Sequence, residues 1–343
     1  MKTKRLVADG TEAATHYEEA VQALRSGELV AFPTETVYGL GALATDEEAV
    51  QSIFTAKGRP SDNPLIVHIG DQEQVREFAR SVDDVAEQLM DAFWPGPLTL
   101  IFYKKENVLA PSVTAGLETV GLRMPDHPVA LQLLRAIREP IAAPSANKSG
   151  KPSPTEADHV FTDLDGDVRV IIDGGSTAVG VESTILDLTT DVPTILRPGG
   201  VTKEQLERVI GPVEEDVAVG KEEAPRAPGM KYMHYAPEAP LFVFNLATAR
   251  LNEAIEAIHA SGQKVAVVGP EELYDDEADW YFTIGRLHHP DEMAANLYRA
   301  LRQCDLTDAD VILAIETDMH GVGQAVMNRL TKASGGKTYE SKQ

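Results

Sequence analysis

Several basic side chains in the first two hundred residues lie where a predicted helix or strand ends. Lys57 and Arg59 follow the helix expected over residues 45–56, and the others are Arg123, Lys148, Lys151 and Arg197. A triphosphate needs compensating cations in its cleft, where arginine offers a two-pronged donor and lysine a point charge. Lys57 and Arg59 also fit a simpler role, because cations compensate the dipole at the carboxyl end of a helix.

The segment Ser145–Ser153 (SANKSGKPS) follows the strand expected over residues 141–143. Its three serines, one asparagine and two lysines form a dense set of donors that suits phosphate or carboxylate oxygens. It is not a P-loop, since the pattern GxxxxGK[ST] is absent. A solvated surface loop is the alternative interpretation.

Further polar side chains stand at the ends of other predicted strands. The segment PTETVYG (33–39) places the hydroxyls of Thr34, Thr36 and Tyr38 beside Glu35, and Ser183 opens another apolar run. In open α/β sheets such positions tend to face a cleft. His68 lies within the apolar run LIVHI, a setting that is more typical of a core histidine.

Charge and cysteine content exclude several classes of protein. The chain has 31 Lys and Arg against 54 Asp and Glu, a formal net charge of −23, so stable binding to bare DNA or RNA is not expected. Cys304, the sole cysteine, excludes an intramolecular disulfide and a cysteine-based zinc site. No segment approaches the roughly 18 apolar residues of a spanning helix, so we expect a cytoplasmic protein without membrane insertion.

Hydrophobic patterning favours two domains joined by a linker in a chain of 343 residues. Residues 1–211 alternate apolar runs with amphipathic segments, which indicates an α/β or α+β architecture. Thr45 with Glu48 predicts a capping box for the helix over 45–56, and Thr202 with Gln205 predicts one for a helix that ends at Gly211. Strands are expected at residues 29–34, 65–69, 98–103, 141–143, 168–173, 183–188 and 194–197.

Composition changes after residue 211. Residues 212–240 contain five prolines and an acidic patch at 214–216, which is typical of an extended linker. Residues 241–343 then alternate strands and helices in the manner of a small parallel, Rossmann-like sheet. The predicted strands are 241–244, 264–269, 280–284 and 310–315, and the predicted helices end at 260 or span 291–302 and 323–332.

Taken in order, these segments resemble the threonylcarbamoyl-AMP synthase family in its long form, which has a YrdC-like catalytic domain, a linker and an additional C-terminal domain. The resemblance rests on PTETVYGLG (33–41), IFTAKGRP (53–60), NPLIVHI (63–69), WPGPLTL (94–100), VGLRMP (120–125), APSANKSGKPSPT (143–155), GVESTILDL (180–188), ILRPGG (195–200), PGMKYMHYAPEAP (228–240) and GVGQAVMNRLTKAS (321–334). It implies an α/β fold in which a twisted, open, mixed sheet with helices precedes the linker and a small Rossmann-like domain.

The same resemblance implies a nucleotidyltransferase that condenses L-threonine, bicarbonate or CO2 and ATP, with Mg²⁺ on the nucleotide, to threonylcarbamoyl-AMP and pyrophosphate. A separate tRNA threonylcarbamoyl transferase complex would use the product, so this chain itself would not bind tRNA stably. The order of carbamate formation and adenylation stays open. The linker would cover the cleft and exclude water from a labile mixed anhydride.

Matching positions transfer the family's site residues to this sequence. The KxR motif is Lys57 and Arg59, and the SxN motif is Ser145 and Asn147; the resemblance places both at the ATP phosphates as the catalytic groups. The other residues implied to bind the nucleotide are Asn63, Thr119, Ser153, Arg197 and Tyr235. The residues implied to bind L-threonine are Thr36, His68, Arg123, Ala143 and Ser183. Arg123 is a natural fork for a carboxylate. Metal ligands are not predicted.

Three other interpretations compete with this one. A double-stranded RNA-binding module would use the basic concave face of a YrdC-like fold, and the charge of −23 argues against it. A carbamoyltransferase of the hydrogenase-maturation type has a related domain, but the single cysteine disfavours it because that type carries zinc-finger cysteines. The last hundred residues could have a nucleotide-sensing or structural role of their own.

Overall fold

A computed structural model describes residues 2–8, 13–216, 226–228 and 234–340. The chain forms two compact units. The first comprises residues 1–149, 153–178 and 182–231, and the second comprises 150–152, 179–181 and 232–343. Parts of the predicted linker, 217–225 and 229–233, lie outside the described residues.

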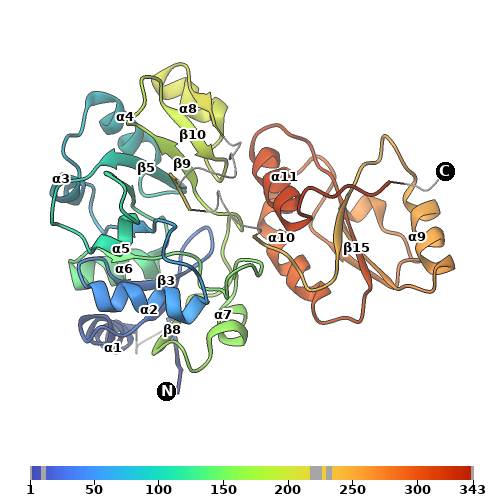
Figure 1. Ribbon diagram of the computed structural model, residues 1–343, viewed down its shortest axis with the longest axis horizontal. Coiled ribbons are helices and arrows are strands. Elements are labelled where there is room, and N and C mark those ends of the chain that lie inside the picture. The colour runs from blue at the N-terminus through green and yellow to red at the C-terminus, as the bar shows by residue number, and fades with distance from the viewer. Residues whose placement is uncertain (1, 9–12, 217–225, 229–233, 341–343) are drawn as a thin grey trace. The chain divides into compact units, whose positions relative to one another are not determined.

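A single mixed sheet organises the first unit, in the strand order β1-β8-β2-β3-β7-β4-β6-β5-β9-β10-β11. Parallel pairs such as β5 with β9 occur beside antiparallel pairs such as β9 with β10, and these three neighbouring strands are labelled in Figure 1. The mixed α/β fold is therefore confirmed. The strands are β1 (Lys4–Val7), β2 (Val30–Pro33), β3 (Tyr38–Leu43), β4 (Ile66–His68), β5 (Leu98–Tyr103), β6 (Thr119–Arg123), β7 (Ile141–Ala142), β8 (Val170–Asp173), β9 (Thr184–Asp187), β10 (Thr194–Arg197) and β11 (Glu214–Glu215).

Helices cover both faces of this sheet. Neighbouring residues of β2 enter different hydrophobic clusters: Ala31 packs with residues of α2, and Phe32 packs with residues of α1 and α6. Burial on both faces explains why β2 and β3 are continuously apolar rather than alternating. The helices of this unit are α1 (Ala13–Arg25), α2 (Glu47–Lys57), α3 (Val75–Phe78), α4 (Asp84–Phe93), α5 (Pro111–Thr114), α6 (Pro128–Ile137), α7 (Ala157–Leu164) and α8 (Lys203–Ile210).

Helix α2 differs from its prediction at the first turn. The cap is Asp46, whose carboxylate accepts the backbone N–H groups of Glu48 and Ala49, so the expected capping box of Thr45 was wrong. Aspartate in an extended conformation at this position satisfies two otherwise orphaned donors. The other end is confirmed, because Gly58 adopts a left-handed conformation with φ 62° and ends the helix. The capping box of Thr202 and Gln205 on α8 is also confirmed.

Two segments expected to be irregular are strands. Tyr38–Leu43 forms β3, an antiparallel partner of β2, where the sequence predicted only the end of one strand. Gly41 is needed in this pair, because a Cβ atom there would lie 2.8 Å from the Phe32 ring. The acidic residues Glu214 and Glu215 form β11, which pairs in parallel with β10, so the linker does not begin as an unpaired segment.

The second unit contains a four-stranded sheet in the order β12-β15-β13-β14. Every pair is parallel, as the predicted Rossmann-like alternation requires (Figure 1). Its strands are β12 (Leu241–Phe244), β13 (Val265–Gly269), β14 (Trp280–Thr283) and β15 (Val311–Ile315), and its helices are α9 (Leu251–Ala260), α10 (Pro290–Cys304) and α11 (Val322–Ala333).

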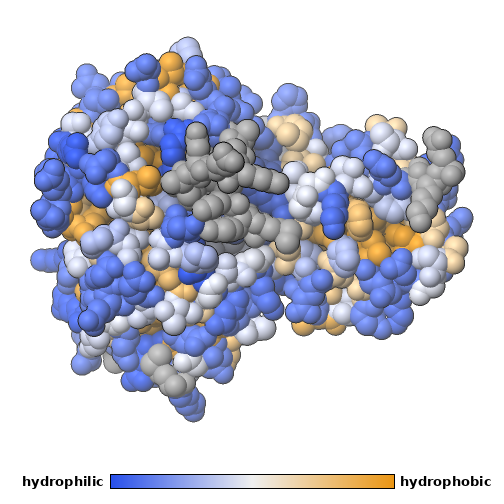
Figure 2. Space-filling view, viewed as in Figure 1, coloured by the Kyte–Doolittle hydropathy of each residue, from blue (hydrophilic) through white to orange (hydrophobic). Residues whose placement is uncertain are grey.

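The visible surface is mainly hydrophilic, as the acidic excess predicts (Figure 2). Large exposed apolar side chains such as Tyr274 and Leu306 are spread along the chain. Within the described ranges, none of the helices has the length and apolar character needed to cross a bilayer.

Candidate functional site

Lys57 joins the two predicted phosphate motifs. It is the last residue of α2 and is buried, and its Nζ donates to the carbonyl oxygens of Ser145 and, at 2.7 Å, Asn147. In return, the backbone N–H of Ser149 donates to the Lys57 carbonyl at 2.8 Å. The KxR motif and the SxN loop are therefore neighbours in space, although nearly ninety residues separate them in sequence.

Lys148 also ties this loop to α2. Its Nζ donates to the Ala56 carbonyl and to the Asp167 carboxylate, both at 2.6 Å. Its ammonium thus has a structural role at the end of the helix. Lys151, another cation of the same loop, belongs to the second unit, where it faces Glu238 at 3.6 Å.

Arg59 and Asn63 lie just beyond α2. Arg59 donates from Nη2 to the Asn63 carbonyl at 3.4 Å, which brings the two predicted nucleotide residues together. The Asn63 side chain is fully buried, and within the described part of the chain neither its Oδ1 nor its Nδ2 has a hydrogen-bond partner. Because a buried amide without partners is costly, Asn63 is well suited to receive a ligand.

His68 and Arg123 end two neighbouring parallel strands, β4 and β6, and are aligned Cα partners. Burial, assisted by the positive charge of Arg123, lowers the pKa of His68 to about 3, so its imidazole is neutral. Its Nδ1 has no hydrogen-bond partner in the described ranges. Arg123 is 4% exposed; its Nε donates to the Gly96 carbonyl at 3.3 Å, and its Nη2 lies 2.7 Å from Glu35 Oε2.

Ser183, predicted to bind L-threonine, contacts Arg197, predicted to bind the nucleotide. Its Oγ lies 2.8 Å from Thr99 Oγ1 and accepts a hydrogen bond from Arg197 Nη2 at 3.2 Å. Arg197 also donates to the Ser183 carbonyl at 3.2 and 3.0 Å, from Nε and Nη2. These bonds fix the guanidinium at the end of β10.

The remaining predicted residues of the first unit are also buried near strand ends. Thr36 Oγ1 lies 2.8 Å from Thr34 Oγ1 in the turn between β2 and β3. Ser153 donates to Glu182 at 2.6 Å, directly beside Ser183. Ala143 follows β7, and its N–H donates to the Ile66 carbonyl at 3.0 Å.

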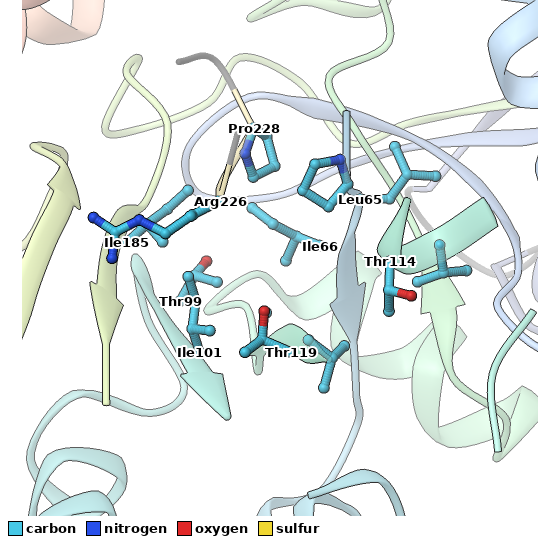
Figure 3. A pocket seen from close by; sticks show the side chains of 13 residues that line it. Leu65, Ile66, Thr99, Ile101, Thr114, Thr119, Ile185, Arg226 and Pro228 are labelled. Atoms are coloured by element: carbon cyan, nitrogen blue, oxygen red, sulfur yellow. The ribbon is translucent and has the colours of Figure 1, made fainter. Parts of the chain in front are cut away.

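Thr119 lines a hollow between the sheet and residues 226–228 of the predicted linker. Figure 3 shows its hydroxyl with that of Thr99 below Ile66, and with Arg226 and Pro228 closing the opposite side. The lining consists of Pro64, Leu65, Ile66, Thr99, Ile101, Val113, Thr114, Thr119, Val120, Gly121, Ile185, Arg226 and Pro228. Apart from Arg226 and Gly121, this lining consists of prolines, branched aliphatic side chains and three threonines.

Arg226 and Pro228 were missed by the sequence analysis, which treated their segment as linker. Arg226 forms ion pairs with Asp216 and, at 3.2 Å, with Asp187 Oδ2. Ala227 is fully buried in a cluster that includes Ile66 and Ile185, and Arg197 donates to the Pro228 carbonyl at 3.4 Å. The signal in the sequence was an arginine between prolines in an otherwise acidic segment.

Tyr235 is described within the second unit. It is buried there, with its ring stacked on Tyr298 at a centroid distance of 5.3 Å. Arg329, which is also fully buried, places its Cζ 5.7 Å from the centre of the same ring. The part of Tyr235 in nucleotide binding stays a prediction.

Comparison with known proteins adds independent information. The Sua5/YciO/YrdC family model, described as telomere recombination, matches residues 22–199, and the model of the threonylcarbamoyl-AMP synthase C-terminal domain matches 201–335. The threonylcarbamoyl-AMP synthase of Bacillus subtilis is 52% identical over 98% of this chain and 99% of its own. The chain belongs to the threonylcarbamoyl-AMP synthase family. The namesake from Pyrococcus abyssi is also 52% identical, over 91% of this chain and 92% of its own.

A solved structure of a Sua5 protein has the same fold. The crystal structure of P. abyssi Sua5 complexed with L-threonine matches with a TM-score of 0.91 and 47% identity, covering 98% of this chain and 99% of that one. The resemblance seen in the sequence is therefore confirmed. Membership of the threonylcarbamoyl-AMP synthase family also favours the enzyme over the RNA-binding and hydrogenase-maturation alternatives.

Proposed function

We propose that the protein is an L-threonylcarbamoyladenylate synthase, a nucleotidyltransferase that forms threonylcarbamoyl-AMP and pyrophosphate from L-threonine, bicarbonate or CO2 and ATP. The observation that carries this proposal is the attachment of the SxN loop to the KxR motif through Lys57. It gathers cationic side chains and loop donors at one place in a strongly acidic protein. Family membership supports the same activity.

The nucleotide would occupy the region between Lys57 and the hollow lined by Thr119. Its base would lie beside Thr119, whose hydroxyl can bond a ring nitrogen, and the hollow would have to widen to enclose a purine because its open space is about that of one water molecule. In the sequence, Asn63 lies between Arg59 of the KxR motif and Pro64, which lines the hollow. Its side-chain amide has no partner in the described residues, and its backbone carbonyl accepts a hydrogen bond from Arg59. Arg59, Ser145, Asn147, Ser153 and Arg197 would hold the phosphates and ribose, and Tyr235 from the linker would complete the nucleotide site.

L-Threonine would bind at the ends of β4 and β6. Arg123 offers its guanidinium to the carboxylate, and the neutral His68 can accept a hydrogen bond at Nδ1 from the substrate hydroxyl. Thr36, Ala143 and Ser183 complete this predicted pocket. The hydrogen bond from Arg197 to Ser183 would link the amino-acid and nucleotide sites.

The reaction needs little covalent help from the protein. The ammonium of threonine first loses a proton to solvent. The neutral amine then attacks CO2, which forms the C–N bond and releases a second proton to solvent, and an oxygen of the resulting carbamate attacks the α-phosphorus in line. A new P–O bond forms there while the bond to the β-phosphate oxygen breaks, and pyrophosphate leaves with the electron pair. Positioning and neutralisation of the charge on the phosphates dominate such transfers, and these are the tasks of Lys57, Arg59, Ser145 and Asn147.

We expect Mg²⁺ to be bound mainly through the nucleotide. Magnesium prefers phosphate and water oxygens, often with one or two carboxylates. Across the ranges that the structure describes, no three His, Cys, Asp or Glu side chains are gathered to hold an ion. That distribution fits a metal that is delivered with ATP, where it would neutralise the leaving pyrophosphate.

We also propose that the product passes to a tRNA threonylcarbamoyl transferase complex in the cytoplasm. The net charge of −23 disfavours a lasting complex of this chain with bare tRNA. A mixed anhydride is labile in water, so direct delivery to the transferase would limit its hydrolysis.

Pyrophosphate release tests the proposed activity. Purified full-length protein is incubated with ATP and Mg²⁺, and L-threonine and bicarbonate are each omitted in turn. Release should require both co-substrates, and the adenylated product should appear in equal amount by mass spectrometry. Release that is independent of threonine would remove the assignment.

A further inference from the structure

Glu35 is a buried carboxylate without an assigned role. It lies in the turn between β2 and β3 and is 7% exposed. Its Oε2 lies 2.7 Å from Arg123 Nη2, and no residue in the described ranges donates a hydrogen bond of normal geometry to either carboxylate oxygen. A buried carboxylate is ordinarily stabilised by several donors, so Glu35 retains unused acceptor capacity.

The turn that carries Glu35 is held in place by its own hydrogen bonds. Thr34 Oγ1 accepts the backbone N–H groups of Thr36 and Val37 at 3.2 and 3.3 Å and donates to the Val37 carbonyl at 2.7 Å. The Tyr38 hydroxyl then donates to the Gly175 carbonyl at 2.7 Å. The position of Glu35 is therefore set by the fold and does not depend on its ion pair alone.

Charge complementarity identifies what Glu35 can do. A free α-amino acid carries an ammonium as well as a carboxylate. The residues predicted to bind L-threonine include a cation, Arg123, but no anion. His68 is neutral and cannot supply the missing charge. Glu35 is the carboxylate in contact with Arg123, so it lies close to where the amino group of a ligand held by Arg123 must be.

Another titratable group that interacts with Glu35 is His127 at the start of α6. Burial lowers the pKa of His127, although the charges of Glu35 and Asp126 oppose this effect. The His127 Nδ1 is already used, since it accepts the backbone N–H of Val129 at 3.2 Å. That bond caps the first turn of α6 and fixes the orientation of the His127 ring.

We propose that Glu35 is a positioning residue that provides the counter-charge for the ammonium group of the bound amino acid. This inference rests on the proposed function. Arg123 then binds the carboxylate of the zwitterion, and Glu35 binds its ammonium. The pair selects a free α-amino acid and fixes its nitrogen, the atom that becomes the carbamate.

Two ligands that differ only in the amino group separate this role from a purely structural one. L-Threonine carries the ammonium, and (R)-3-hydroxybutanoate keeps the carboxylate and the hydroxyl without it. Their dissociation constants are measured by calorimetry on full-length wild-type protein and on Glu35→Gln, which keeps the shape and removes the charge. Asp173→Asn is the matched control, because Asp173 also pairs with an arginine, Arg5, at 2.7 Å in the same sheet.

Glu35→Gln should weaken L-threonine binding about 10- to 100-fold, as expected for the loss of a charged hydrogen-bond partner. It should leave 3-hydroxybutanoate binding unchanged or stronger, so the preference for threonine falls, whereas Asp173→Asn should keep the wild-type preference. An unchanged preference, including equal weakening of both ligands, would overturn the proposal. If Glu35→Gln does not fold, Glu35→Asp replaces it and must retain a preference for threonine.

The proposed function fails in a different way. Wild-type protein that binds no L-threonine would remove the substrate itself and the inference with it. Wild-type protein that binds L-threonine, combined with an unchanged preference in Glu35→Gln, would remove only the role of Glu35. Binding of ATP with Mg²⁺ is measured in parallel, and a loss there in Glu35→Gln would indicate general disruption of the site and contradict the proposal.

Discussion

His68 and Arg123 occupy the same level of the sheet, because they are the final, aligned residues of two adjacent parallel strands. Burial, reinforced by the neighbouring cation, keeps the imidazole neutral, and the pKa of His68 falls to about 3. In the unfolded chain the same imidazole has its ordinary value near 6.5. This difference makes the stability of the first unit depend on pH.

Lowering the pH from 7 to 5 should destabilise the first unit through His68. Between about pH 6.5 and pH 3 the unfolded chain binds a proton that the folded one excludes, so stability rises with pH, by up to about 1.4 kcal/mol per unit. Urea unfolding, followed by Trp94 fluorescence in a Trp280→Phe background, measures this slope. It should flatten in His68→Asn and persist in His320→Gln, whose histidine is exposed; an unaltered slope in His68→Asn would contradict the assignment.

Arg59→Ala and Ser145→Ala should reduce kcat/KM by about 100-fold or more, since each removes a group that we propose acts on the developing charge of the phosphates. Neither change removes a core side chain, so the melting temperature should stay within a few degrees of the wild type. Pyrophosphate release and thermal melts check both expectations. Full activity in either variant would exclude that residue from the site.

Lys57→Met should affect both activity and stability. The ammonium is buried and bonds two loop carbonyls, which would lose their donor in the variant. We expect a loss of about 2–4 kcal/mol in the free energy of unfolding, together with loss of turnover. Lys148→Met removes a partly exposed lysine of the same loop and should cost less. Equal stability of Lys57→Met and wild type would show that the loop does not depend on this side chain.

Arg123→Met should raise the KM for threonine by about 100-fold and leave ATP binding within twofold. It should also destabilise the protein by about 3–5 kcal/mol, because Glu35 is left as an unpaired buried charge. The double variant Glu35→Gln with Arg123→Met should regain much of that stability. Denaturant unfolding of all four proteins gives the coupling energy, and strictly additive effects would rule out the ion pair in solution.

Truncation after Pro228 should preserve the first unit, and truncation after Gly211 should not. The shorter chain loses β11, the ion pairs of Arg226 and the buried Ala227, and exposes the apolar cluster around Ile66. Both chains lack Tyr235 and should turn over poorly. Thermal melts and pyrophosphate release test this, and turnover equal to that of the full chain would contradict the proposed role of the linker.

Local signals in the sequence predicted much of the fold. The strands over 98–103 and 194–197 agree residue by residue with β5 and β10, because compact apolar runs end at polar or proline residues. Asp46 was missed as a cap since Thr45 and Glu48 form a plausible motif, and only the backbone angles decide between neighbouring candidates. The strand β3 was missed because the polar residues that precede it, 34–36, resemble a loop.

The candidate site was less accessible from sequence than the fold. The motifs indicated Lys57 and Arg123, yet the partners of those side chains come from distant segments, the loop carbonyls at 145 and 147 and the carboxylate of Glu35. Such contacts depend on strand order, which a sequence without homologues does not specify. The segment Arg226–Pro228 was hidden for the same reason, since its proline-rich composition is that of a spacer.

The attachment of the SxN loop to α2 also affects the entropy of binding. A loop that a ligand has to order reduces that ligand's affinity by the conformational freedom it removes. Here Lys57 and Lys148 immobilise the loop before any nucleotide arrives. The triphosphate therefore meets a preorganised surface, and its affinity is reduced less by ordering of the protein.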